Sequence, residues 1–404
     1  MPATLAYGPP AAAGLSPASL AAANRALQEA MGVVCPAAVL LVARHGVVAW
    51  HRAYGWLDPE TRLQPTRRDS IFDLASVTKL FATTAFMTLV EAGRVALDQP
   101  VAEVLPTFRG PRPIAAYEDP LNPGAMIEVV PATSELVEAG QVTFRQLLTH
   151  TSGLPAWKPL YRLPGGREAI FAAAAQVPFA YPPGQRVLYS DLGLILLTTA
   201  IERLAGEPLD AYLRRAVLKP LGLSETHYRP TSASSAYPLR RRPSADIAPT
   251  ELCAWRGRRL RGEVHDENAA AMGGVSGHAG LFATAWEVAV LGQLYLNGGV
   301  YAGRRLLAPA TVAAMTSEQA AFADERRGLG WMLKSLQASS AGRYFSPRSY
   351  GHTGFTGTSL WVDPERELLV VLLTNRVYYG RSNAAEILTL RQAVHEAVSR
   401  DLEV

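Results

Sequence analysis

Two apolar hairpin patterns stand at opposite ends of this 404-residue chain and restrict the folds open to it. Near the N-terminus two apolar runs flank His45-Gly46, and near the C-terminus two more flank Glu365-Arg366. These four runs cover residues 37–44, 47–55, 359–364 and 367–375. Capped or amphipathic helical patterns cover 15–31, 76–92, 143–149, 191–205, 208–218, 285–296 and 383–401. The order predicts an α+β fold: one antiparallel sheet built from both chain ends and flanked by the terminal helices, with an inserted all-helical lobe.

The length implies two lobes, or one large core with long insertions, because a single core rarely grows past about 250–300 residues. We expect 1–75 and 340–404 to form an α/β sheet lobe and 76–339 a mainly helical lobe. Two stretches without periodicity, 106–141 and 229–264, are expected to be long loops, which are usually functional or disordered. We expect the two lobes to form one catalytic unit with its site in a cleft between them. Loop 229–264 is expected to line this cleft.

The positive charge comes almost wholly from arginine, since only four of the 39 basic residues are lysine. Much of the excess lies in one region, at Arg240, Arg241, Arg242, Arg256, Arg258, Arg259 and Arg261. Such a cluster could hold nucleic acid or an anionic substrate, but a solvated loop is the interpretation we favour. No aromatic-interleaved basic strand accompanies the cluster, so we expect no nucleic-acid partner.

Membrane, redox and metal signals are weak throughout the chain. No segment reaches the 18 or so apolar residues of a membrane span, and the N-terminus lacks the pattern of a signal peptide, which predicts a cytoplasmic protein. Cys35 and Cys253 have no metal-site spacing and are expected to be buried thiols. No HExxH, Walker or Rossmann motif is present, so we expect no metal and no cofactor. The oligomeric state stays open.

Ser76-Val77-Thr78-Lys79 is the only Ser-x-x-Lys in the chain and opens a strongly apolar helix. Residues three apart share a helix face, so the hydroxyl and the amine should lie side by side. Free N–H groups at a helix start favour a developing oxyanion. Burial can lower the pKa of a lysine from about 10.4 and make it a base. Ser76 is therefore a candidate nucleophile and Lys79 its base. A serine that caps the helix and a lysine that reaches solvent would also produce the Ser-x-x-Lys pattern.

Tyr189 is the second candidate, in Tyr189-Ser190-Asp191 at a loop-to-helix junction. A phenol near the serine and the lysine could relay protons to the leaving group. Tyr117 and Tyr295 match the same Tyr-x-Asp/Asn pattern, but the first lies in a Pro-rich loop and the second at a helix end. No serine has glycine both two before and two after it, which disfavours the α/β-hydrolase elbow.

The third motif is His352-Thr353-Gly354, just before the C-terminal hairpin. Small residues there would let a substrate backbone lie along an edge strand, although a Gly-rich turn is the alternative.

The ordered set SVTK, YSD and HTG resembles the serine β-lactamase and penicillin-binding D,D-peptidase superfamily over nearly the whole chain. The segments LLTHTSGLP, IAPTE, WRG, GEVHDENA, GGVSGHAGLF and GHTGFTGTSLWVDPERELLVVLLTN narrow the resemblance. They look like the class C type branch, with its family VIII esterases, cell-wall amidases and penicillin-binding protein 4B-like members. The resemblance implies a β-lactamase/D,D-peptidase-like fold.

The resemblance also implies roles for individual residues. Ser76 would attack a carbonyl, Lys79 and Tyr189 would share the proton transfers, and the backbone N–H groups of Ser76 and Phe355 would form the oxyanion hole. The third motif, His352, Thr353 and Gly354, would bind substrate together with Asp191.

Two departures from the family pattern bear on the substrate. Many relatives have asparagine where Asp191 stands, and an ionised carboxylate cannot donate to a substrate, so Asp191 is expected to orient Lys79 instead. Many have lysine where His352 stands, and a histidine is largely neutral near pH 7. Both changes disfavour β-lactam turnover and favour esters or muropeptide amides. The histidines His150, His265 and His278, with Asp266, are expected to stabilise turns.

The leading hypothesis is a serine hydrolase that forms an acyl-enzyme on Ser76 with small esters, amides or peptidoglycan-derived and β-lactam-like substrates. An acyltransferase of the same fold and a penicillin-binding sensor that is acylated without turnover are the alternatives.

Overall fold

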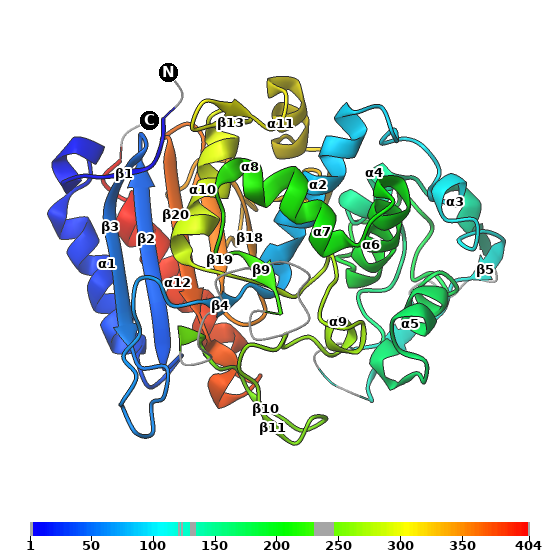
Figure 1. Ribbon diagram of the computed structural model, residues 1–404, viewed down its shortest axis with the longest axis horizontal. Coiled ribbons are helices and arrows are strands. Elements are labelled where there is room, and N and C mark those ends of the chain that lie inside the picture. Colours follow the sequence, from blue (N-terminus) through cyan, green and yellow to red (C-terminus); the bar gives the residue numbers. More distant parts are fainter. Residues whose placement is uncertain (1–2, 120–121, 123, 130–134, 230–245, 403–404) are drawn as a thin grey trace.

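A nine-stranded sheet dominates the computed structural model, which describes residues 3–119, 122, 124–129, 135–229 and 246–402 (Figure 1). The strand order is β1-β3-β2-β20-β19-β18-β17-β16-β15, and every neighbouring pair is antiparallel except the β1–β3 pair. Its strands are β1 (Ala6–Tyr7), β2 (Ala37–Arg44), β3 (Val47–Gly55), β15 (Ala320–Phe322), β16 (Glu325–Arg327), β17 (Met332–Leu333), β18 (Tyr350–Thr353), β19 (Ser359–Asp363) and β20 (Leu368–Thr374). Both predicted hairpins, and the meeting of the two chain ends in one sheet, are confirmed.

Strands β2 and β20 are buried on both faces, which explains why both read as continuous apolar runs. Side chains alternate between the faces, so Leu40 packs in one core cluster and Leu41 in the other. The cluster of Leu40 includes residues of α1 (Pro17–Ala30) and α12 (Ala384–Ser399), and that of Leu41 includes residues of α10 (Ala285–Leu296). The terminal helices therefore cover one face of the sheet and α10 covers the other.

The sheet begins earlier in the chain than the predicted boundary at residue 340, because β15, β16 and β17 continue it beyond β18. These strands have two or three residues each, too short to show a period of two in the sequence. The boundary at 340 is therefore wrong for the sheet, and the division into two lobes stays a prediction.

The other α-helices of the described residues lie in the middle of the chain, as predicted (Figure 1). They are α2 (Thr78–Glu91), α3 (Val101–Val104), α4 (Phe144–Leu148), α5 (Gly166–Ala174), α6 (Asp191–Ala205), α7 (Leu209–Leu213), α8 (Lys219–Leu221), α9 (Glu267–Ala271) and α11 (Pro309–Thr316). Local caps start several of them: the Ser16 side chain accepts from the first turn of α1, and Thr143 forms a capping box with Gln146 on α4. These short-range contacts explain why the helix starts were readable from the sequence.

The smaller strands form separate pairs and one three-stranded sheet. They are β4 (Phe72–Asp73), β5 (Pro111–Pro113), β6 (Tyr117–Glu118), β7 (Met126–Ile127), β8 (Leu136–Glu138), β9 (His227–Tyr228), β10 (Leu252–Cys253), β11 (Arg258–Arg259), β12 (Leu281–Ala283), β13 (Val300–Tyr301) and β14 (Arg304–Arg305). Predicted loop 106–141 thus holds β5 to β8. The small sheet β4-β12-β9 carries β4, which leads into the Ser-x-x-Lys segment.

Predicted loop 229–264 is only partly described, and Arg240, Arg241 and Arg242 lie outside the described residues. Within the described part, Arg256 donates to the carbonyls of Val264 and His265. Arg259 and Arg261 likewise donate to backbone carbonyls, whereas Arg258 pairs with Glu263. For these arginines the expectation of a merely solvated loop is wrong, because most of them tie the loop to itself and to its neighbours.

Both cysteines are buried thiols, as expected, and burial raises the pKa of Cys35 to about 12. Across the described ranges, the structure contains no helix that is both long and apolar enough to cross a membrane.

Candidate active site

A cleft of about 570 Å³ opens over Ser76, and its walls come from distant parts of the chain. They combine the Ser76 segment, the loop before α5, the start of α6, residues 251–255 of predicted loop 229–264, the α9 region and the turn after β18. Its lining residues include Ala75, Ser76, Trp157, Tyr161, Tyr189, Asp191, Glu251, Trp255, His265, Asp266, Glu267, His278, Phe355 and Arg381. The described part of loop 229–264 therefore does line the cleft, as expected.

Ser76 lies in a short 3-10 turn, Ala75–Val77, between β4 and α2. The preceding residue, Ala75, has φ +45°, a left-handed conformation that is uncommon outside glycine. The buried Asp73 carboxylate holds this turn, because it accepts the N–H of Ala75 at 2.8 Å and that of His265 at 2.7 Å. Burial raises the pKa of Asp73, and these two donors oppose the rise. Sequence reasoning overlooked Asp73, although a carboxylate three residues before the candidate nucleophile was a visible signal.

Lys79 lies beside Ser76, as the spacing predicts, with its Nζ donating to Ser76 Oγ at 2.9 Å. The side chain is only 1% exposed, and its Nζ also donates to the carbonyl of His278 at 2.9 Å. Asp191 Oδ1, at the start of α6, lies 2.7 Å from the same nitrogen. The ammonium is therefore held between a hydroxyl, a carbonyl and a carboxylate.

The charge state of Lys79 corrects the sequence argument. Burial works to lower the pKa of Lys79, but the negative charge of Asp191 and the contact with Tyr189 outweigh it, so that the pKa is raised. The resting lysine is a charged donor rather than the neutral base that burial alone would produce. This agrees with the expectation that Asp191 orients Lys79.

The Tyr189 phenol lies above the lysine, with its ring centre 4.9 Å from Lys79 Nζ. The ring is also 4.7 Å from that of His150, whose Nδ1 accepts the Ser190 N–H at 3.1 Å. Burial raises the pKa of Tyr189, while the nearby charge of Lys79 opposes the rise. The phenol is therefore protonated at neutral pH and close to Lys79.

The turn after β18 is joined to the Ser76 segment by two hydrogen bonds. Thr356 Oγ1 donates to the Asp73 carbonyl at 2.8 Å, and Thr358 Oγ1 donates to the Leu74 carbonyl at 2.9 Å. These bonds place Phe355 at the cleft, where among the described residues its own N–H has no hydrogen-bond acceptor. A free N–H at this position is what the implied oxyanion hole requires.

Three groups clamp Phe355. The ring of His265 stacks on it at 5.5 Å, the guanidinium of Arg376 lies 4.6 Å from its ring centre, and Arg376 Nε donates to its carbonyl at 2.8 Å. The third member, Arg381, lies 5.8 Å from the same ring.

The third motif lies behind the cleft rather than along it. His352 is 1% exposed, and its Nδ1 is 2.8 Å from the Thr353 carbonyl, which can only accept, so Nδ1 carries the proton. Burial and the charges of Lys79 and Arg327 lower the pKa of His352 well below its ordinary value. A Cβ on Gly354 would lie 2.5 Å from the Leu74 carbonyl, so that glycine serves close packing. None of His352, Thr353 and Gly354 lines the cleft of the described residues, and their substrate contact stays a prediction.

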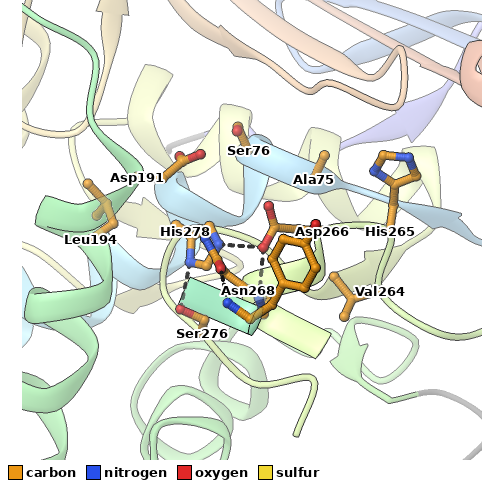
Figure 2. A network of polar contacts seen from close by, with 12 residues as sticks. Ala75, Ser76, Asp191, Leu194, Val264, His265, Asp266, Asn268, Ser276 and His278 are labelled. Atoms are coloured by element: carbon orange, nitrogen blue, oxygen red, sulfur yellow. Dashed lines mark hydrogen bonds and ion pairs between the residues drawn. The ribbon is translucent and has the colours of Figure 1, made fainter. Parts of the chain in front are cut away.

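A polar network supports the carbonyl that binds Lys79. The His278 ring lies between Ser276 Oγ, 2.7 Å from its Nδ1, and Asp266 Oδ1, 2.8 Å from its Nε2 (Figure 2). Burial raises the pKa of Asp266, but the charge and hydrogen bond of His278 outweigh it, so that the carboxyl stays ionised. Asp266 also accepts the Ala269 N–H and caps α9. The contacts of Asp266 and His278 fit the turn-stabilising role expected for them, and the same role stays a prediction for His150 and His265.

No group of three or more His, Cys, Asp and Glu side chains that could hold a metal ion occurs in the described part of the chain.

The Beta-lactamase family model matches residues 23–395. A "Putative D-alanyl-D-alanine carboxypeptidase" of Escherichia coli (strain K12) is 31% identical over 401 residues, which cover 91% of this chain and 84% of the relative.

Two solved structures share the fold. EstCE1, described as a hydrolase with promiscuous acyltransferase activity, has a TM-score of 0.69 at 23% identity and covers 94% of this chain and 98% of its own. Simvastatin Synthase (LovD) from Aspergillus terreus has a TM-score of 0.70 at 19% identity and covers 96% of this chain and 100% of its own. With the family model matching most of the chain, the protein belongs to the Beta-lactamase family and has its serine-hydrolase-type fold.

Proposed function

We propose that the protein is a serine hydrolase that forms an acyl-enzyme on Ser76 with small esters, amides or peptides. The single observation that carries the proposal is the 2.9 Å contact between Lys79 Nζ and Ser76 Oγ at the floor of a 570 Å³ cleft. A packed structural serine would not need an ionisable partner and an open cavity together.

The proton path begins at the ion pair. An ammonium has no lone pair, so Lys79 first passes a proton to Asp191 Oδ1 over the 2.7 Å contact. A substrate that excludes water favours this step, because a low-dielectric site disfavours separated charges. The freed lone pair then takes the Ser76 proton as Oγ bonds to the carbonyl carbon. Both of these proton transfers thus run over contacts of 2.9 Å or less.

The oxyanion and the leaving group need separate donors. The N–H groups of Ser76 and Phe355 stabilise the oxyanion, each by a factor on the order of a hundred or more in rate. When the tetrahedral intermediate collapses, the bond to the leaving group breaks and Tyr189 donates its proton to that group. Lys79 reprotonates Tyr189, and water attacks the acyl-enzyme by the reverse order of proton transfers.

Covalent labelling tests the proposal. The protein is exposed separately to an activated ester, a β-lactam and a phosphonate, and the adduct is located by mass spectrometry. Labelling on Ser76, and a loss of activity on the order of a thousandfold or more in Ser76→Ala, are expected. Ser317→Ala, which alters an exposed serine on another surface, serves as the control. Label on another residue, or full activity in Ser76→Ala, would refute the proposal.

Product analysis divides the alternatives. With an added alcohol, an acid product indicates hydrolysis and a new ester indicates transfer, whereas a stable adduct without turnover indicates a sensor.

A further inference from the structure

Three aromatic side chains form one wall of the cleft, which we call the aromatic wall: Trp157, Tyr161 and Trp255. The rings of Tyr161 and Trp255 meet edge to face at 4.9 Å, and those of Trp157 and Tyr161 are 6.3 Å apart. Trp255 is nevertheless 48% exposed, and its neighbour Leu252, also on the cleft, is 66% exposed. A contiguous apolar surface exposed inside a cleft is typical of a binding site.

The aromatic wall is held in place from behind. Asn268, fully buried on α9, accepts the Tyr161 N–H at 2.8 Å and donates to the Lys158 carbonyl at 2.8 Å. Asp266 caps the same helix and binds His278, so Tyr161 is tied to the network that supports Lys79 (Figure 2). A wall fixed before substrate arrives loses little entropy when a ring stacks on it.

Trp255 is held in place in a similar way by the segment that follows β11. The next residue, Arg256, donates to the carbonyls of Val264 and His265 at 2.7 and 2.9 Å. The guanidinium lies 5.2 Å from the Trp255 ring centre, so the ring rests on an anchored side chain.

The charges of the cleft oppose an anionic substrate. Four carboxylates line it, on Asp191, Glu251, Asp266 and Glu267. Three cations face them, and each already has a carboxylate partner: Lys79 pairs with Asp191, Arg381 with Glu251 and Glu267, and Arg162 with Glu118. The carboxylates that line the cleft therefore outnumber these cations by four to three. His352, where a cation would stand in many relatives, is buried and neutral.

We propose that the cleft takes neutral acyl donors that carry an aromatic or other flat apolar group, stacked on the aromatic wall. It discriminates against donors with a carboxylate next to the scissile bond, as a terminal D-alanyl residue has. This inference rests on the proposed function and names the substrate class of the same site. Stacking supplies affinity, and the paired charges leave a substrate carboxylate without a counter-ion.

Thioesters of matched structure test both parts, with thiol release followed by a chromogenic disulfide; both cysteines of the protein are buried, which limits the background. Three compounds vary the position of the aromatic group. The S-ethyl thioester of acetic acid has none, the S-ethyl thioester of phenylacetic acid has it on the acyl side, and the S-benzyl thioester of acetic acid has it on the thiol side. The phenylacetyl thioesters of thioglycolate and of its methyl ester differ only in a carboxylate. All rates are divided by the hydroxide rate of the same compound.

At least one of the two aromatic donors is expected to exceed the acetyl S-ethyl compound about tenfold in kcat/KM. Trp255→Ala is expected to abolish that advantage. Trp255→Phe should retain most of this advantage, and Trp56→Ala, at a residue that lines a different cavity, should retain all of it. The methyl ester is expected to be preferred over the thioglycolate by about tenfold.

The result separates the inference from the proposed function. If turnover depends on Ser76 but Trp255→Ala leaves the aromatic advantage unchanged, or the thioglycolate is preferred, the inference is overturned and the hydrolase proposal stands. If turnover does not depend on Ser76, both fall.

Discussion

Replacing Asp191 with asparagine removes the counter-charge of Lys79 and keeps the shape of the side chain. At 2.7 Å and an effective dielectric constant near 20, the two charges attract by about 6 kcal/mol. The desolvation of both groups opposes this attraction, and removing one partner of a buried pair costs about 3–5 kcal/mol. We therefore expect Asp191→Asn to lower the free energy of unfolding by about 3 kcal/mol near pH 7.

The stabilities of the wild type and of Asp191→Asn should depend on pH in opposite directions. In the native protein the pKa of Lys79 lies above its ordinary value of 10.5, so the ion pair stabilises the fold fully below that value and less as the pH rises through the raised pKa. In Asp191→Asn the main opposition to burial is gone and the pKa of Lys79 is lowered, so the stability of the variant rises with pH until the unfolded lysine also loses its proton. The difference between the two proteins should therefore shrink from the lowered pKa of the variant upward, and it should go on shrinking above pH 10.5 as the native ion pair loses its charge.

Urea unfolding at a series of pH values measures this difference. Asp98→Asn is the matched control, because Asp98 lies at the same 2.7 Å from Arg145 but is exposed at the surface, where such a pair contributes about 1 kcal/mol or less. Ester turnover by Asp191→Asn should also fall by about a hundredfold, since Lys79 loses its proton acceptor. A loss of stability no greater than that of Asp98→Asn, or one that persists unchanged at alkaline pH, would refute the reasoning.

Two further variants test the supports of the site and of the sheet. Asp73→Asn should lower kcat about tenfold with little change in KM, because one of the two N–H groups that fix the turn before Ser76 loses its acceptor. Steady-state kinetics at a temperature where the variant is folded checks this, and an unchanged kcat would contradict it. Trp361→Ala, at a fully buried position of β19, should cost about 3–5 kcal/mol, whereas Trp255→Ala on the exposed wall should cost less than about 1 kcal/mol by urea unfolding.

Local patterns in the sequence were sufficient for the longer helices and strands and for one candidate catalytic pair. The hairpin at His45-Gly46, the cap at Ser16 and the three-residue spacing of Ser76 and Lys79 depend on contacts within one turn of the chain. Such contacts repeat with the period of a helix or a strand, so they can be read directly. The family motifs added Tyr189, which the structure places beside that pair.

Tertiary structure alone decided the electrostatic state of the site. Whether Lys79 is charged depends on the balance between its burial and a carboxylate brought from α6, and that balance reversed the direction expected from burial alone. The burial of His352, the clamp on Phe355 and the aromatic wall likewise join segments far apart in the chain. Charge and solvation energies vary with distance in space, which no local spacing of residues encodes.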